Sequence, residues 1–190
     1  EGQNIGGVQG AFVLANINAD KAALNFVNQS TQRAWYAISQ SGYVQQPSAE
    51  AIKNGVEIDR TYLDKDGKPV TSVKLGDIIN VQVNVRSLQN EQDNMMITDL
   101  YPAGFEVVTG NGDMSAQEET QQRFNWVHRD LREDRMLSYG SVGETTTVIQ
   151  YQLKAVNVGK FKIPQAYAEN MYNRAVNAQS AAKGDIEVIQ

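Results

Sequence analysis

The sequence predicts an all-β protein folded as an antiparallel β-sandwich, with extra N-terminal strands that belong to a neighbouring β-domain. Three observations lead to this fold class. Apolar and polar residues alternate with a period of two, which places alternate side chains on opposite faces of a strand. Residues that tolerate a positive φ separate the alternating segments. Helical periodicity is nearly absent, and several short strands at this spacing are typical of a sandwich.

Three candidate strands lie near the N-terminus: Ala11–Asn18, Ala23–Asn28 and Arg33–Gln40, the last with Ala34, Tyr36 and Ile38 in alternation. A free-standing sheet of this size would bury too little apolar area to offset its ordering entropy. These strands are therefore either additions to the main domain or half of a neighbouring domain, and we favour the second. The boundary falls near Gln45–Asn54, giving units at residues 1–47 and 52–190.

The clearest alternation lies in the second unit, where each segment has one apolar and one polar face. Its apolar members are Ile79, Val81, Val83 and Val85 in one segment and Ile149, Tyr151 and Leu153 in another. Turn residues divide the unit at Asp66-Gly67, Asn111-Gly112 and Asn157-Val158-Gly159. Met114–Gln122 is rich in helix formers but has no apolar stripe, so it is interpreted as a solvated loop or one short helical turn.

The C-terminal third has the most informative order of elements. Strands are predicted at Thr146–Val156 and Lys160–Pro164, joined by the turn at residues 157–159. An aromatic loop, Tyr167 to Tyr172, follows them. Ala178–Gly184 is small and polar and is interpreted as a mobile connection.

Composition excludes several function classes. A chain of 190 residues without cysteine has no disulfide, no thiolate zinc site and no cysteine nucleophile. The net charge is −5 with both signs interspersed, so no basic face for nucleic acid is expected. No apolar run approaches the roughly 20 residues that span a bilayer.

Two motifs resemble known chemical sites but lack the rest of the pattern. His128-Arg129-Asp130-Leu131 matches the start of a kinase catalytic loop, yet Arg135 stands where a metal-binding Asn is needed. Asp64-Lys65-Asp66-Gly67 resembles the start of a calcium loop, but Lys68 supplies no ligand. We interpret the first match as chance and the second as a charged turn, so neither a cofactor nor a metal is expected.

Hydrolytic chemistry is also not expected. His128 is the only histidine, and Ser141 lies in Tyr-Gly-Ser-Val-Gly, a partial match to a nucleophile elbow without a helix behind it. Carboxylate pairs such as Glu118/Glu119 and Glu133/Asp134 need a cleft with raised pKa values to act as acid and base. On a polar loop they are solvated charge, so no catalytic residue is assigned and the chain is predicted not to be an enzyme.

The aromatic loop is the candidate functional site. Tyr167, Met171 and Tyr172 lie close together on a segment without a regular period. In one interpretation these side chains plug the end of the sandwich. In the other they are exposed and form a contact surface for another domain, since aromatic residues on a rigid β-scaffold suit that role.

A series of segments carries a family resemblance. In order they are Ile58–Tyr62, Asp66-Gly67, Val73–Asp77, Ile79–Val85, Asp99–Glu106, Arg132–Arg135, Tyr151–Pro164 and Ala168–Tyr172. The most specific signal is Ala-Glu-x-Met-Tyr after a Gly-x-Phe-x-Ile-Pro strand. Together these segments resemble the C-terminal part of bacterial alpha-2-macroglobulins, from about residue 55 to residue 190 and weakly before.

The resemblance implies a macroglobulin-like or receptor-binding-like sandwich that closes a very large periplasmic protease trap, with membrane anchoring through the parent's N-terminus as an open option. Many such proteins capture proteases through a thioester in a separate helical domain. Their last domain packs on that domain, and a Met-Tyr pair shields the thioester; by position, Met171 and Tyr172 match the pair. Residues 1–47 would be the second half of a bridging domain. Implied partners are neighbouring domains, target proteases and envelope proteins.

One departure from the family pattern leaves the parent's chemistry open. The residues after the Met-Tyr pair include a proline and a bulky aromatic residue in the family, whereas Asn173–Val176 offers neither. Either the shielding is weaker here or the parent belongs to a branch without a thioester. The alternative function is a structural or adhesive β-sandwich of a surface protein.

Overall fold

The computed structural model describes residues 27–29, 31–37, 48–109 and 126–190. The chain divides into two compact units, residues 1–43 and 44–190. In the first unit, residues 31–37 are exposed and outside any strand, and the Arg33 guanidinium lies over the ring of Trp35.

The predicted strand at Arg33–Gln40 is therefore wrong for residues 33–37. Alternation alone therefore does not make these residues a strand. Most of the other two N-terminal strands lies outside the described residues. The extra N-terminal strands and the domain assignment of residues 1–47 stay predictions.

In the described residues of the second unit, the regular secondary structure consists of strands joined by turns and loops. Their bounds are β1 Ile52–Asn54, β2 Val56–Leu63, β3 Ser72–Lys74, β4 Ile78–Ser87, β5 Gln92–Leu100, β6 Phe105–Val107, β7 Trp126–Leu131, β8 Arg135–Val142, β9 Thr147–Ala155, β10 Gly159–Lys162, β11 Tyr167–Asn170, β12 Asn177–Gln179 and β13 Asp185–Ile189.

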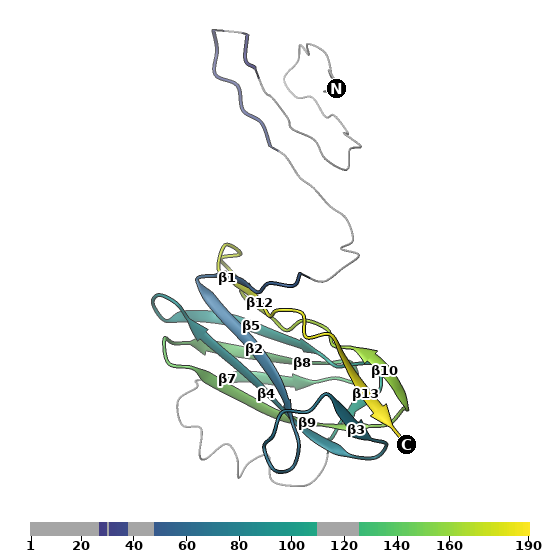
Figure 1. Cartoon of the computed structure of the whole chain (residues 1–190). Helices are drawn as coiled ribbons and strands as arrows, with labels where there is room; N and C mark the ends of the chain where they lie inside the picture. Colours follow the sequence, from purple (N-terminus) through teal and green to yellow (C-terminus); the bar gives the residue numbers. More distant parts are fainter. Residues whose placement is uncertain (1–26, 30, 38–47, 110–125) are drawn as a thin grey trace, which may run out of the picture. The chain divides into compact units, whose positions relative to one another are not determined.

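These strands form three sheets (Figure 1). A six-stranded sheet has the order β1-β12-β11-β5-β8-β7, and a four-stranded sheet has the order β2-β4-β9-β6. Both are antiparallel, and they enclose one continuous apolar core. The third sheet, β10-β13-β3, contains a parallel pair, β13 with β3. This architecture confirms the predicted all-β sandwich.

Period-two alternation produces the core as predicted. Along β4 the apolar residues from Ile79 to Val85 are at most 1% exposed, and along β9 the inward set from Ile149 to Leu153 is at most 2% exposed. Met95 and Ile97 of β5 and Met136 of β8 face them from the six-stranded sheet and are fully buried. Burial of such side chains contributes roughly 1.5–3 kcal/mol each, which makes this layer the main source of stability.

The strands β9 and β10 follow each other across residues 156–158, close to the predicted bounds, and belong to different sheets. One C-terminal expectation is wrong. Ala178–Gly184 is not a mobile connection at its start, since Ala178 lies in β12 and Ser180 is 2% exposed. β12 pairs with β1 on one side and with β11 on the other, and this pairing orders the start of the segment.

The Asp64–Lys68 segment is a turn, as interpreted. The Asp64 carboxylate accepts hydrogen bonds from the backbone N–H groups of Asp66 and Lys68 at 2.9 and 2.8 Å, and Gly67 has φ +77°. Such a side-chain-capped turn uses the carboxylate locally. The Asn111-Gly112 turn and the Met114–Gln122 segment lie outside the described residues.

Candidate interdomain contact surface

The connection between β11 and β12 presents two of the three predicted site residues to solvent. Met171 is 42% exposed and Tyr172 is 83% exposed. Neither side chain plugs the sandwich, so this interpretation is wrong for both residues. An exposed tyrosine on a hairpin connection leaves a large apolar ring available for contact.

Hydrogen bonds fix the shape of this connection. The Asn170 carboxamide accepts from the backbone N–H groups of Tyr172 and Asn173 at 3.0 and 2.9 Å. The Val176 N–H donates to the Asn173 carbonyl at 2.9 Å, and the Asn177 side chain donates to the Arg174 carbonyl at 2.8 Å. Tyr172 therefore projects from an ordered connection, which reduces the entropy lost when a partner binds.

A β-bulge on the neighbouring strand supports the same connection. The pairing of β5 with β8 shifts register between Gln92 and Met95, and Asn94 has φ +55°. The Asn94 carbonyl accepts from the Met171 N–H at 3.0 Å, and the Asp93 carbonyl accepts from the Asn170 side chain at 2.8 Å. Bulges re-aim nearby groups, and here the bulge anchors the residues that present Met171.

Tyr167, the third predicted residue, lies elsewhere. It begins β11, between Gln179 of β12 and Thr98 of β5, so the expectation of an irregular segment from residue 167 onward is wrong for residues 167–170. Its hydroxyl donates to the Glu169 carboxylate at 2.8 Å. Burial, together with this hydrogen bond, raises the pKa of Tyr167 to about 12. The alternation of buried Ala168 with its neighbours is the sequence signal for this strand.

A cluster of buried charged side chains lies in the core, against the backbone that precedes β11. None of its residues is among the functional residues predicted from the sequence. Arg60 on β2 is 2% exposed and forms an ion pair with Asp99 on β5, which is fully buried. Arg60 also donates to the Pro164 carbonyl, and the Tyr151 hydroxyl donates to Asp99 at 2.7 Å. The signal is an arginine at an inward position of an alternating strand, between Ile58 and Tyr62.

The arginine of this cluster keeps its charge in the core, whereas burial raises the pKa of Asp99 against the opposing effects of Arg60 and Tyr151. Burial acts to lower the pKa of Arg60, but the facing Asp99 carboxylate outweighs this effect and raises the pKa above its ordinary value. Burial raises the pKa of Tyr151 well above its ordinary value, so this phenol stays protonated and can donate. A buried pair of this kind links the two sheets through hydrogen bonds whose partners cannot be replaced by water.

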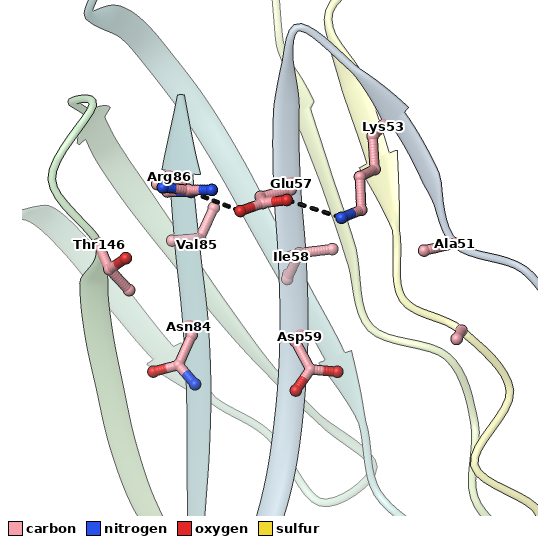
Figure 2. A pocket seen from close by; sticks show the side chains of 10 residues that line it. Ala51, Lys53, Glu57, Ile58, Asp59, Asn84, Val85, Arg86 and Thr146 are labelled. Atoms are coloured by element: carbon pink, nitrogen blue, oxygen red, sulfur yellow. Dashed lines mark hydrogen bonds and ion pairs between the residues drawn. The ribbon is translucent and has the colours of Figure 1, made fainter. Parts of the chain in front are cut away.

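A cleft of about 290 Å³ lies on the outer side of β1, β2 and β4 (Figure 2). Glu57 stands at its centre, pairing with Lys53 at 2.8 Å and with Arg86. Hydrogen bonds from Lys53 and then Arg86 lower the pKa of Glu57, so its carboxylate is ionised near neutral pH. None of the three predicted site residues lines this cleft.

The predicted chemical motifs are placed as follows. The Ser141 hydroxyl donates to Asp93 at 2.8 Å, while the His128 ring stacks on Tyr139 with a centroid separation of 6.2 Å. Among the described residues, no cluster of three or more acidic or histidine side chains could hold a metal ion. Within the same part of the chain, no helix is long and apolar enough to cross a membrane.

Comparison with known proteins identifies the family. Residues 55–174 match the profile described as the bacterial alpha-2-macroglobulin MG10 domain. The chain belongs to the bacterial alpha-2-macroglobulin family. It is 44% identical to an alpha-2-macroglobulin from Pasteurella multocida over 99% of its length and 39% identical to a homologue from Yersinia pestis over 96%.

Solved structures of family members agree with this assignment. The native conformation of Escherichia coli alpha-2-macroglobulin aligns over 78% of this chain with a TM-score of 0.69 and 26% identity. Salmonella alpha-2-macroglobulin reacted with methylamine gives the same score and coverage at 25% identity. The chain spans about a tenth of the length of these alpha-2-macroglobulins.

Proposed function

We propose that this chain is a non-catalytic module of a bacterial alpha-2-macroglobulin-like protease trap, and that the connection carrying Met171 and Tyr172 docks on a neighbouring domain of the parent protein. The observation that carries the proposal is the ordered presentation of Tyr172, 83% exposed on a hydrogen-bonded hairpin connection. Relatives are named as alpha-2-macroglobulins, and the chain covers about 10% of each.

The chemistry of the two side chains suits a shielding role. A tyrosine ring supplies a flat apolar surface with one polar group, and a neighbouring thioether adapts to irregular surfaces. If the parent carries a thioester, this pair excludes water from it. If the parent lacks one, the same pair is a docking contact within the folded parent. In both cases we place the parent in the periplasm, where proteases and envelope proteins are its partners.

The test uses the intact parent protein. It is incubated with a broad-specificity protease, and its shape is followed by small-angle scattering for the wild type and for Tyr172→Ala. We expect cleavage to change the shape strongly, and we expect the uncleaved variant to show part of that change already, because the docking contact is weakened.

Val158→Ala is the matched control, since Val158 is also an exposed apolar residue, 55% exposed, on a different connection. It should behave as the wild type does. Identical scattering from the wild type and Tyr172→Ala, before and after cleavage, would overturn the docking role. The module would then be the passive structural sandwich of the alternative interpretation.

A further inference from the structure

The outward faces of the two large sheets differ in chemistry. On the four-stranded sheet the central outward positions of β4 and β9 carry carboxamides, Asn80, Gln82, Asn84, Gln150 and Gln152, with Ile78 and Val148 nearer the strand ends. These side chains bond to one another, Gln152 to Asn80 at 2.9 Å and Gln150 to Gln82 at 3.3 Å. A polar face that satisfies itself in this way is suited to water.

The six-stranded sheet carries large apolar side chains at its outward positions. Inward residues alternate with Met96 on β5, Leu137 and Tyr139 on β8, and Tyr167 on β11. The register places Met96 opposite Tyr139, and Thr98 lies between Leu137 and Tyr167. The His128 ring, stacked on Tyr139, continues this row onto β7. We refer to Met96, Leu137, Tyr139 and Tyr167 as the outer patch.

The outer patch adjoins the connection that carries Met171. Glu169 of β11 lies opposite Met96, and two residues later the chain reaches Met171. The Met171 N–H donates to Asn94, which is two residues before Met96 on β5. An apolar centre with aromatic residues and a polar rim is the usual composition of the core of a protein interface.

We infer that the outer patch is a second, larger part of the docking surface, and that its partner is another domain of the same parent, with an apolar face and a basic side chain opposite Glu169. The inference rests on the proposed function in that it places this module among other domains. About nine-tenths of each long relative lies outside the matched segment, so the parent has many domains to supply the partner.

The basic side chain follows from the position of Glu169. Its carboxylate is half-buried beside the apolar row, and it accepts one hydrogen bond, from Tyr167. Covering a carboxylate with an apolar surface is costly unless a cation or further donors pair with it. A partner that covers Met96 and this carboxylate therefore has to bring a cation or further hydrogen-bond donors to this point, and we assign this role to a lysine or arginine.

Hydroxyl-radical footprinting with peptide mass spectrometry tests the inference on the 190-residue chain and on the intact parent. It measures labelling of the outer patch and of the Met171–Tyr172 pair in one experiment. We expect Met96, Tyr139 and Tyr167 to be labelled several-fold more slowly in the parent than in the separate chain. Met95 and Met136, fully buried in the core, are internal standards whose labelling should stay low in both.

The two proposals give different results. Slow labelling of Met171 and Tyr172 with unchanged labelling of the outer patch supports the proposed function and overturns this inference. Protection of the outer patch without protection of Tyr172 supports the inference and shows that the connection carrying Met171 and Tyr172 does not dock. If protection in the parent is lost on dilution, the occupant is a second copy of the protein, and the inference is also overturned.

Charge reversal tests the chemistry of the partner. In the parent, Glu169→Lys should restore labelling of Met96 and Tyr139 toward that of the separate chain, and Glu169→Gln should do so less. Glu106→Lys, on the outward face of the four-stranded sheet, is the matched control and should leave protection unchanged. Equal effects of Glu169→Lys and Glu106→Lys would overturn the requirement for a basic partner residue.

Discussion

At the scale of single residues, the most unusual feature is a charged pair buried in the core. Arg60 joins β2 to Asp99 of the opposite sheet and to the carbonyl of Pro164, three residues before β11. Its guanidinium lies 5.0 Å from the centre of the Tyr62 ring. We expect this set of contacts to favour one alignment of the two sheets, because a shifted register would leave the buried charges unpaired.

Breaking this ion pair should lower the stability of the fold strongly. Arg60→Met leaves the buried Asp99 carboxylate without its cation, and we expect the free energy of unfolding to fall by about 3–5 kcal/mol. Urea denaturation of the chain measures this change. Replacing both members, Arg60→Met with Asp99→Leu, should cost clearly less than the sum of the two single changes. Additive losses would contradict the coupling.

Alkaline pH should act through Tyr167. The pKa of this phenol is about 12 in the folded chain, against an ordinary value of 10, so the folded state keeps the proton longer than the unfolded state. The resulting stability is fully present below pH 10 and is lost as the pH rises through about 12.

The comparison with Tyr167→Phe measures this effect, because the variant has no phenol to ionise. The stability of the wild type relative to Tyr167→Phe should decrease between pH 10 and about 12. Glu169→Gln should lower the pKa of Tyr167, as seen by NMR titration of labelled tyrosine. A difference in stability that stays constant over this range would contradict the assignment.

At the scale of elements, the Pro102–Phe105 connection shows why one glycine is required. A Cβ added to Gly104 would lie 2.1 Å from the Phe161 ring, which belongs to β10. The Gly104 carbonyl accepts from the Val156 N–H at 2.9 Å, so the backbone is held in place from the other side. Gly104 is thus where the third sheet meets the sandwich.

Gly104→Ala should destabilise the chain by about 1–3 kcal/mol, because the new methyl group forces the Phe161 ring to move. Thermal or urea unfolding measures the loss. Adding Phe161→Ala should recover part of it, since the clash then disappears, whereas Phe161→Ala alone should destabilise. Independent effects of the two substitutions would mean that the ring has room to shift.

The strands that could be predicted from the sequence are those whose alternation is long and regular. The segments at β4 and β9 have unbroken apolar faces, and both were predicted close to their observed bounds. The strands β11 and β12 are short, contain Ala168 and Ala178 at their buried positions, and were interpreted as loops. Their stability comes from pairing with β5 and β1, more than 60 residues away in sequence, which a local pattern does not contain.

The same distinction between local and long-range information explains which parts of the candidate site could be predicted. Met171 and Tyr172 are exposed, which agrees with their predicted place on an irregular segment. The local turn is sufficient to expose both side chains, so distant strands do not have to be known. Tyr167 was misplaced because its surroundings are set by strands on both sides. The Arg60–Asp99 pair joins residues 39 positions apart, and only the packing of two sheets brings them together.

At the scale of the whole molecule, the described strands of the sandwich all lie in the second unit. Among the residues that the structure describes, the buried apolar core lies between Val56 and Val188. The described residues of the first unit, 27–29 and 31–37, are exposed. The sandwich therefore has the core of an independent domain.

Removal of residues 1–43 should leave the sandwich folded. We expect one cooperative thermal transition with a midpoint within about 4 °C of the full chain, because a change of 1 kcal/mol shifts a domain of this size by roughly that amount. Circular dichroism or calorimetry measures the midpoint. A much larger fall would show that the first unit contributes to the stability of the second.

The pairing of early strands with late ones also determines when this module can fold during its synthesis. β1 takes its partner from β12, and β3 takes its partner from β13, so residues 52–54 wait for residues 177–179 and residues 72–74 wait for residues 187–189. A ribosome releases the N-terminal part first. Until the last strands emerge, β1 and β3 expose unpaired edges, which are prone to wrong association. The four-stranded sheet has all its strands once Ala155 has emerged, whereas the six-stranded and three-stranded sheets are completed only after nearly the whole module has left the ribosome.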